Sequence, residues 1–496
     1  MLDYVWQQTQ LYLENKKKAD RKKIGQFFTP PETARFMAGM FEIPCKTELS
    51  ILDPGAGTGI LSVALIQRIT QECPAVTTIR LTCFENNHDV LPLLDENLRY
   101  VQNLLPTGLL FYTIISDNYI TSQKDDFNAT LLSNENTPKF DLIIGNPPYK
   151  KVMSDSNEAK AMPVICYGAP NLYFLFAAMS LFNLKENGEM VFIMPRSWTS
   201  GAYFKAFRDY FLSHGKIHNI HLFISREKVF DKEQILQETM IVRVRKQKTE
   251  PISIKITTSE SGNDYNNITV INAPYYAVVS SREKYVYMIT SSKELNVLTR
   301  LSEYDDTLLS IGLRMKTGLT VDFRNQDVLR SQPGDHIIPM FYAQHIQQGK
   351  VVFPANRKYE YITDERTGLL QKNKNYVFVK RFTAKEEHRR LQCGIYLRNI
   401  LPEYHLISTQ NKINFIDCID GSEMSPSVAY GLYVLLNSTI YDQYYRILNG
   451  STQVNSTEIN GMPIPRMQKI IEYGTKLIKA GSLTTEMCDK ILEGAI

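Results

Sequence analysis

Asn146 and Tyr149 are separated by two prolines and follow an apolar run, a pattern that can hold a planar group bearing an amino nitrogen. Residues 142–144 predict a buried strand that ends at a glycine. The prolines restrict φ and remove backbone donors, so the turn is stiff and the carbonyl of Pro147 is free to accept a hydrogen bond. An amide, a rigid carbonyl and an aromatic ring together can bind the edge of a nucleobase and cover its face. The simpler alternative is an ordinary turn, since such proline dipeptides are common in loops.

A glycine-rich turn lies further upstream. Residues 49–53 predict a short strand that ends in Asp53, and Pro-Gly-Ala-Gly-Thr-Gly follows at 54–59 before an apolar helix. A strand, a glycine turn and a helix form the first unit of a doubly wound α/β sheet. The spacing of Gly55 and Gly57 departs from the dinucleotide fingerprint, and no Gly-Lys-Ser/Thr follows, which excludes a Walker phosphate loop. The turn therefore indicates a ligand only in combination with the acidic residues around it.

Acidic residues follow the next two expected strands. Strand 79–84 leads to Glu85, which is placed to accept hydrogen bonds from ribose hydroxyls. Strand 111–115 leads to Asp117, whose carboxylate can accept a hydrogen bond from an adenine amino group. The strand ends recur at a spacing of roughly 30 residues, as in repeated βα units, and parallel strands bring such ends to one rim. We therefore expect a nucleoside-type cofactor to lie across that rim.

The residues after the Asn-Pro-Pro-Tyr sequence predict the rest of this sheet. Residues 150–170 are polar and irregular, which predicts a loop beside the site. Two further strands are expected as a hairpin at 217–224 and 239–245. Phe230 lies between them, where its ring can reach the same rim; packing in the core is an equal alternative.

The N-terminal segment precedes the first strand. Residues 1–24 predict an amphipathic helix that ends in lysines and arginine, which form either a solvated face or a contact with a DNA backbone. A helix is expected to begin at Thr29 or Pro30, because proline is favoured in a first turn. Phe28, just before this start, is either a hydrophobic staple or the wall of a cofactor pocket.

The chain of 496 residues is too long for one core, so at least two domains are expected. The regular alternation of strands and helices fades near residue 250, which predicts a first domain at 1–250 and a second at 251–496. The composition, with 43% hydrophobic and 22% charged residues, is ordinary for a globular protein. The net charge of +4 permits an anionic partner without requiring one.

Two clusters in the second domain suggest contact with an anionic partner. Residues 376–382 interleave aromatic and basic side chains, including Lys380 and Arg381, and basic residues continue to Arg389 and Arg390. Short polar side chains gather after a helix expected at 429–448, and these are Thr452, Gln453 and Asn455. Plain solvated surface is the alternative for both clusters.

Several classes of protein are excluded. The N-terminus is polar and basic, without a secretory signal, and the most apolar run, 172–182, is too short to span a bilayer. We expect a soluble, cytoplasmic protein with no membrane partner. The seven cysteines contain no Cys-x-x-Cys pair, which predicts reduced thiols and no metal site; they are Cys45, Cys73, Cys83, Cys166, Cys393, Cys418 and Cys488.

The motifs together resemble those of S-adenosylmethionine-dependent DNA methyltransferases that modify amino groups. The resemblance rests on Asp-Pro-Gly-Ala-Gly-Thr-Gly at 53–59, on Glu85 and Asp117, and on Asn-Pro-Pro-Tyr at 146–149. Gly-Gln-Phe-Phe-Thr-Pro at 25–30 precedes the glycine motif, the order found in the gamma class of N6-adenine enzymes, which includes TaqI-like type II restriction-modification enzymes. Looser blocks in the second half are similar to those of the same class, at 316–318, 379–382 and 451–457.

The resemblance implies a fold, a cofactor and a set of roles. The fold would be a doubly wound, mostly parallel α/β sheet of the class I methyltransferases, with a second, mixed α+β domain that recognises the DNA target. The cofactor would be S-adenosylmethionine, held by Phe28, Thr29, Asp53, Gly55, Gly57, Glu85 and Asp117. Asn146 and the Pro147 carbonyl would hold the N6 amino group of a flipped adenine, with Tyr149, and Phe230 as a second choice, stacked on the base.

The partner implied is double-stranded DNA, bound by a monomer, with a cognate restriction endonuclease as a genetic rather than a physical partner. Three other readings compete with this one. The chain could methylate a protein glutamine or an RNA amino group, although neither needs so large a second domain. It could be fused to a nuclease, for which the segment before the motifs leaves little room. It could also be a DNA-binding regulator on an inactive fold, against which the intact motifs argue.

Overall fold

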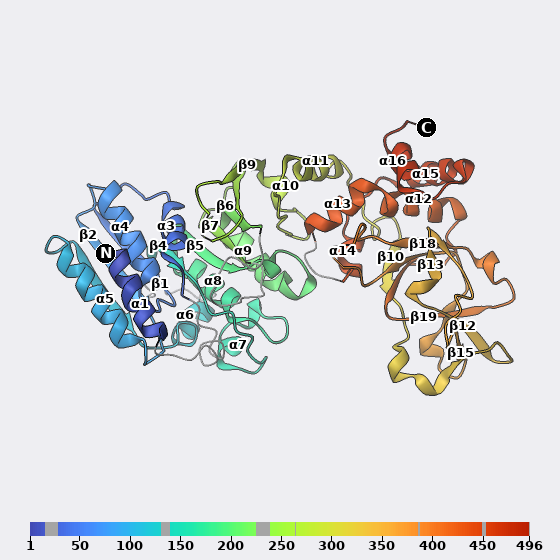
Figure 1. The fold of residues 1–496 in the computed structure, drawn as a ribbon, viewed down its shortest axis with the longest axis horizontal. Coiled ribbons are helices and arrows are strands. Elements are labelled where there is room, and N and C mark those ends of the chain that lie inside the picture. Colours follow the sequence, from blue (N-terminus) through green and yellow to red (C-terminus); the bar gives the residue numbers. More distant parts are fainter. Residues whose placement is uncertain are drawn as a thin grey trace. The chain divides into compact units, whose positions relative to one another are not determined.

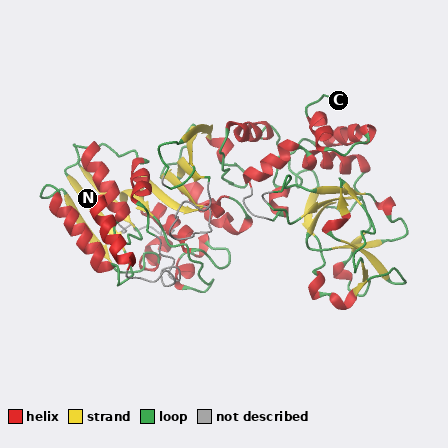
Figure 2. Ribbon diagram, viewed as in Figure 1, coloured by secondary structure: helices red, strands yellow, loops and turns green. Residues whose placement is uncertain are grey.

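The computed structural model describes residues 1–14, 28–129, 139–224, 239–262, 264–384, 387–448 and 453–495. The chain forms two compact units, Met1–Ser291 and Ser292–Ile496 (Figures 1 and 2). The sequence predicted a boundary near residue 250, but the structure divides the chain later. The reason is that the strands that follow residue 250 continue the sheet of the first unit.

The first unit is built on a nine-stranded sheet with the order β3-β2-β1-β4-β5-β7-β6-β8-β9. Its strands are β1 (Glu48–Asp53), β2 (Thr78–Phe84), β3 (Leu110–Ile115), β4 (Phe140–Gly145), β5 (Leu184–Pro195), β6 (Lys216–Phe223), β7 (Thr239–Arg245), β8 (Ser253–Ser259) and β9 (Thr269–Pro274). The first five are mutually parallel. This confirms the expected doubly wound α/β fold, and the antiparallel pairing of β6 with β7 confirms the expected hairpin.

Helices cover both faces of this sheet (Figure 2). They are α1 (Leu2–Glu14), α3 (Pro31–Gly39), α4 (Ile60–Glu72), α5 (Leu91–Leu104), α6 (Lys124–Ala129), α7 (Asn157–Ala161), α8 (Leu172–Asn183), α9 (Lys205–His214) and α10 (Tyr275–Val278). Apolar residues of α1, α3, α4 and α5 share one core with Ile51, Leu142 and Ile144 of the strands. Because side chains alternate along a strand, Ile143 points to the other face.

The second unit contains two smaller sheets. The six-stranded sheet has the order β10 (Leu313–Thr317), β20 (Ile413–Cys418), β17 (Tyr376–Lys380), β18 (Cys393–Tyr396), β14 (Lys350–Val351) and β13 (Ile346–Gln347). The five-stranded sheet has the order β11 (Leu329–Arg330), β15 (Tyr361–Thr363), β12 (Ile337–Phe341), β19 (Leu406–Thr409) and β16 (Gln371–Lys372). With its helices, this unit has the mixed α+β character that the sequence predicted.

The helices of the second unit lie mainly at its C-terminal end. They are α11 (Ser292–Leu301), α12 (Pro426–Asn437), α13 (Thr439–Leu448), α14 (Ser456–Asn460), α15 (Met467–Ala480) and α16 (Thr485–Leu492). The single helix expected at 429–448 is in fact two, because Ser438 adopts an extended conformation with φ −79° and ψ 157°. Among the residues described here, no helix is both long enough and apolar enough to cross a bilayer.

Candidate active site

The strand order places two functional strand ends side by side. β1 and β4 are parallel neighbours, with Leu52 aligned to Ile143, although β2 and β3 separate them in the sequence. The strand order reverses between β1 and β4, and the carboxyl ends at such a switch point form the usual ligand crevice of an open α/β sheet. Asp53 ends β1 and Asn146 directly follows β4, so both residues stand at this crevice.

The glycine turn after β1 is clamped by the residue that follows β2. The backbone N–H of Gly57 donates to Glu85 Oε2 at 2.9 Å, and the N–H of Asn87 donates to Glu85 Oε1 at 2.8 Å. Gly57 has φ +55°, and a Cβ there would lie 3.2 Å from Cε1 of Phe28. The turn therefore requires glycine at this position both for its conformation and for the close approach of the phenylalanine ring.

Asp53 is fully buried, and one of its oxygens lacks a partner. The Ser62 hydroxyl donates to Oδ2 at 2.7 Å, whereas Oδ1 has no hydrogen-bond partner among the described residues. Burial raises the pKa of Asp53 to about 7, and the charge of Glu85 acts in the same direction, against the hydrogen bond from Ser62. A buried carboxylate oxygen without a donor is suited to receive one from a ligand.

Thr29 and Asn146 meet although they are far apart in the sequence. Thr29 is buried just before α3, and its Oγ1 accepts a hydrogen bond from Asn146 Nδ2 at 3.1 Å. Pro147 is buried and Asn146 is half-buried. With Nδ2 turned toward Thr29, Oδ1 is directed to another side of the side chain.

Tyr149 belongs to a group of aromatic rings beside the crevice. Its hydroxyl donates to the Ile193 carbonyl at 3.2 Å, and its ring meets that of Tyr173 edge to face, with centroids 6.4 Å apart. Burial raises the pKa of Tyr149, so the phenol stays protonated and remains a donor. The Tyr173 hydroxyl shares a hydrogen bond with the Ser197 hydroxyl at 3.0 Å. These contacts hold the Tyr149 ring in one orientation.

Of two further predicted residues of this unit, one follows a strand further along the sheet and the other lies outside the described residues. Asp117 is exposed and follows β3, an edge strand that is separated from β4 by β2 and β1. Phe230 lies outside the described residues. Sequence reasoning missed Ser62, whose hydroxyl binds Asp53, and Tyr173, which contacts Tyr149. A buried serine one turn into an otherwise apolar helix was the available signal for Ser62.

Comparison with known proteins agrees with this geometry. The model of the Eco57I restriction-modification methylase family matches residues 67–230. Type II methyltransferase M.PstI of Providencia stuartii is 30% identical over 488 residues, which cover 96% of this chain and 93% of that protein. Type II methyltransferase M.BsuBI of Bacillus subtilis is 32% identical over 467 residues, which cover 93% of this chain and 91% of that protein. The chain belongs to the type II restriction-modification methyltransferases.

Membership confirms the family that the sequence motifs resembled. The chain is a DNA methyltransferase of a restriction-modification system. Among solved structures, the DrdV–DNA complex aligns with 94% of this methyltransferase and 58% of that chain, with 14% identity and a TM-score of 0.47.

The second unit of the methyltransferase brings its two predicted clusters together. Residues Phe382 and Gln453 form an antiparallel bridge, and the Val454 N–H donates to the Arg381 carbonyl at 2.7 Å. Lys380 Nζ donates to Gln392 Oε1 at 2.9 Å. Gln453 and Asn455 are half-buried, whereas Thr452 lies outside the described residues. Residues from two separate parts of the sequence thus meet just beyond the end of β17, an inner strand of the six-stranded sheet.

Several aromatic and basic residues of this cluster are instead buried or hydrogen-bonded within the unit. Tyr376 and Phe378 are buried in the core of the sheet, because they lie on the inner face of β17. Arg390 is 1% exposed, and Arg389 Nη2 donates to the carbonyls of Leu436 and Ser438 at 3.1 Å each. The expectation of contact with an anionic partner is therefore wrong for the buried residues Tyr376, Phe378 and Arg390.

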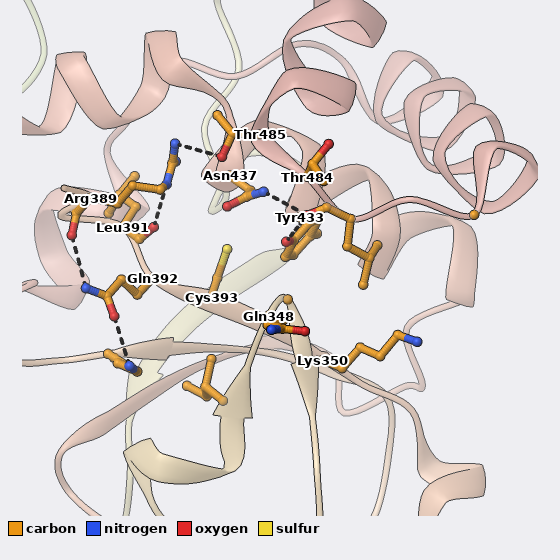
Figure 3. Close-up of a pocket in the computed structure, with 15 residues that line it drawn as sticks. Gln348, Lys350, Arg389, Leu391, Gln392, Cys393, Tyr433, Asn437, Thr484 and Thr485 are labelled. Atoms are coloured by element: carbon orange, nitrogen blue, oxygen red, sulfur yellow. Dashed lines mark hydrogen bonds between the residues drawn. The ribbon is translucent and has the colours of Figure 1, made fainter.

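A hollow of about 570 Å³ lies next to Lys380 in the same unit. Figure 3 shows Lys350 and Cys393 of the sheet, with Gln348 and Gln392 next to its strands, on one side of the hollow. Tyr433, Asn437, Thr484 and Thr485 of the helical region lie on the other side. The Tyr433 hydroxyl donates to the Leu483 carbonyl at 2.7 Å. Of the residues in the predicted basic cluster, Lys380 and Arg389 line this hollow.

Proposed function

We propose that this methyltransferase transfers the methyl group of S-adenosylmethionine to N6 of an adenine that has been turned out of duplex DNA. The modification would protect host DNA from a partner restriction endonuclease. The observation that carries the proposal is the position of Asn146, which follows β4, contacts Thr29 and stands one strand away from Asp53. An amide suited to an adenine amino group and an acid suited to a cationic ligand thus follow or end neighbouring strands, which supports the proposal.

The residues at the switch point fit the cofactor. Asp53 Oδ1 has no partner among the described residues and can accept a hydrogen bond from the methionine ammonium. Each ionised carboxylate has several lone-pair sites, so Glu85 can accept from ribose hydroxyls while it still accepts from Gly57 and Asn87. When bound, S-adenosylmethionine supplies an electrophilic methyl group on a positively charged sulfur. Gly55, Phe28 and Asp117 remain candidates for the rest of this site.

Asn146 and Pro147 would act on the adenine amino group. Its lone pair is delocalised into the ring, which makes N6 a poor nucleophile. Hydrogen bonds from its two hydrogens to Asn146 Oδ1 and to the Pro147 carbonyl favour a pyramidal nitrogen with an available lone pair. After transfer, the extra proton on N6 passes to solvent. No covalent bond to the protein is needed, and alignment of the reactants supplies much of the rate.

Tyr149 would hold the extruded base. Turning a base out of a duplex costs a few kcal/mol, and stacking on an aromatic ring offsets about 1–3 kcal/mol of this cost. The Tyr149 ring is held by the Ile193 carbonyl and by Tyr173 and is therefore ordered before the base arrives. Lys380, Arg381, Thr452, Gln453 and Asn455 are the candidates in the second unit for contacts with the duplex, which a monomer would bind.

The test is transfer of radiolabel from S-adenosylmethionine to duplex DNA, RNA and protein in parallel, followed by nucleoside analysis of the product. We expect label in duplex DNA alone, as N6-methyladenine. Asn146→Ala should abolish transfer and leave cofactor affinity nearly unchanged, whereas Glu85→Ala should mainly raise the cofactor Kd. Label in another nucleoside, in RNA or in protein, or normal turnover by Asn146→Ala, would refute the proposal.

A further inference from the structure

The segment that follows Tyr149 leaves and rejoins the first unit at one point. The Val152 N–H donates to the Pro170 carbonyl and the Leu172 N–H donates to the Lys150 carbonyl, both at 2.8 Å. Lys151 and Asn171 form an antiparallel bridge between these hydrogen bonds. The loop therefore begins directly at the Asn-Pro-Pro-Tyr sequence, and its two ends are fixed to each other.

The interior of this loop is also held in place. Helix α7 lies within it and is capped by Ser156, whose side chain accepts from the Ala159 N–H at 3.2 Å. Asn118 Nδ2 donates to Glu158 Oε1 at 2.9 Å, and Asn128 Nδ2 donates to the Ala161 carbonyl at 2.9 Å. These contacts fix the loop to the residues that follow β3 and to α6.

Three large apolar side chains of this anchored loop nevertheless face solvent. Met153, Val164 and Tyr167 are 69%, 64% and 70% exposed, and we refer to them as the apolar rim. Large apolar side chains that an ordered segment leaves exposed can mark a binding surface. The same loop folds other apolar residues inward, since Met162 and Ile165 are fully buried.

Ring contacts connect the loop to the base site. The Tyr203 hydroxyl donates to the Ala169 carbonyl, two residues beyond Tyr167. The Tyr203 ring contacts Phe204 at 4.6 Å, Phe204 contacts Tyr173 at 6.5 Å, and Tyr173 contacts Tyr149 at 6.4 Å between centroids. The loop thus packs against the aromatic group that holds Tyr149.

The charges of the loop suit a nucleic acid as its partner. Lys150, Lys151 and Lys160 are exposed on it, while one of its two acids, Glu158, is bound to Asn118. Lysines beside apolar side chains combine contact with phosphates and contact with bases, as in proteins that insert apolar wedges into a duplex.

We propose that the apolar rim enters the DNA duplex next to the extruded base and, with Tyr167 foremost, fills the space from which that base has left. The inference rests on the proposed function, because it requires a base to be turned out beside Tyr149. It assigns to the first unit a contact with the duplex itself, in addition to the pocket for the single base. The rim stabilises the open duplex and takes no part in methyl transfer.

The test compares Tyr167→Ala with Tyr276→Ala, a matched control because Tyr276 is a 62% exposed tyrosine of the same unit. The target site is first read from the methylated DNA of cells that express the protein. A duplex with 2-aminopurine at the target adenine then reports base extrusion by fluorescence.

Tyr167→Ala should raise the DNA Kd about tenfold or more and reduce the fluorescence gain. Tyr167→Phe should restore both, and the cofactor Kd should not change.

A second duplex, in which the base opposite the target is absent, makes the test specific. Less stacking must be disrupted to extrude the target in this duplex, so Tyr167→Ala should bind it nearly as well as the wild-type protein does. If Tyr167→Ala matches Tyr276→Ala on both duplexes, or alters only self-association or binding to another protein, the inference is overturned. The proposed function survives that result as long as the wild-type protein methylates adenine in DNA, so the two failures are distinguishable.

Discussion

The side-chain amide of Asn146 donates from Nδ2 to the hydroxyl oxygen of Thr29, 3.1 Å away. This contact joins the segment before α3 to the residue after β4 and holds the Asn146 side chain with Nδ2 toward Thr29. In the proposed reaction Asn146 Oδ1 must accept a hydrogen bond from the substrate, and a rotated amide would present a donor instead. Thr29 is thereby expected to position Asn146, in addition to any contact with the cofactor.

Thr29→Val removes the acceptor and keeps the shape of the side chain. Loss of a single hydrogen bond of about 1 kcal/mol should lower kcat roughly fivefold to tenfold. Thr29→Ser keeps the hydroxyl and should stay close to wild type. Single-turnover transfer and cofactor titration separate the two roles. A raised cofactor Kd with normal kcat would mean that Thr29 serves the cofactor and not Asn146.

Gly57→Ala should impair cofactor binding through the Phe28 ring. The new Cβ lies 3.2 Å from Phe28 Cε1 at a residue with φ +55°. Gly108→Ala is the control, because Gly108 has φ +84° but no atom within 4 Å of a new Cβ. Both changes should reduce the free energy of unfolding by about 1–2 kcal/mol, owing to the left-handed backbone. Only Gly57→Ala should also raise the cofactor Kd, measured by calorimetry; equal Kd values for both variants would contradict the assignment.

Cofactor affinity should rise with pH up to about 7, where Asp53 loses its proton because burial raises its pKa to about 7. The ionised form attracts the methionine ammonium, so binding should release a proton, which calorimetry in buffers of different ionisation enthalpy detects. Asp53→Asn should remove the part of this dependence that comes from Asp53, while any titration of the ligand and of Glu85, whose pKa burial also raises, remains. An unchanged pH profile in Asp53→Asn would exclude Asp53 as its source.

The same group should affect stability. Its pKa in the folded chain lies above its ordinary value of 3.8, so the folded state binds more protons between these two values. The contribution of Asp53 to the free energy of unfolding should therefore fall as pH rises from about 4 to about 7 and then level off. Buried His221, whose pKa burial lowers to about 3, contributes in the opposite direction, so the Asp53 contribution is read from the difference between wild type and Asp53→Asn, measured by urea unfolding without cofactor. A difference that does not fall across this window would contradict the argument.

Gly431→Ala should destabilise the second unit, where α12 and α15 approach closely. A Cβ at Gly431 would lie 1.9 Å from the Ile470 carbonyl oxygen, and one at Gly474 would lie 1.8 Å from that of Ser427. Such overpacking typically costs about 1–3 kcal/mol or more. Gly368→Ala, with no atom within 4 Å of the new Cβ, is the control. DNA affinity should fall in Gly431→Ala while cofactor affinity persists, and equal melting curves for the two variants would be the contrary result.

The sequence alone determined the parts of the site that lie within single strand-turn units. Apolar runs ending at Asp53, before Glu85 and before Asn146 predicted β1, β2 and β4, and the structure has these strands there. Such signals are local, because the pattern of apolar and turn-forming residues that predicts a strand, a turn and a helix lies in consecutive residues. The parallel order of these strands then brings their ends to one rim.

Only the tertiary structure decided what lies beside these ends. Three features depend on residues far away in the sequence. They are the contact between Thr29 and Asn146, the Asp53 oxygen that has no hydrogen-bond partner among the described residues, and the burial of Tyr376. The extension of the first unit past residue 250 likewise follows from the pairing of β8 with β6. No local pattern encodes these outcomes, because each depends on which side chains the folded chain brings into the same small volume.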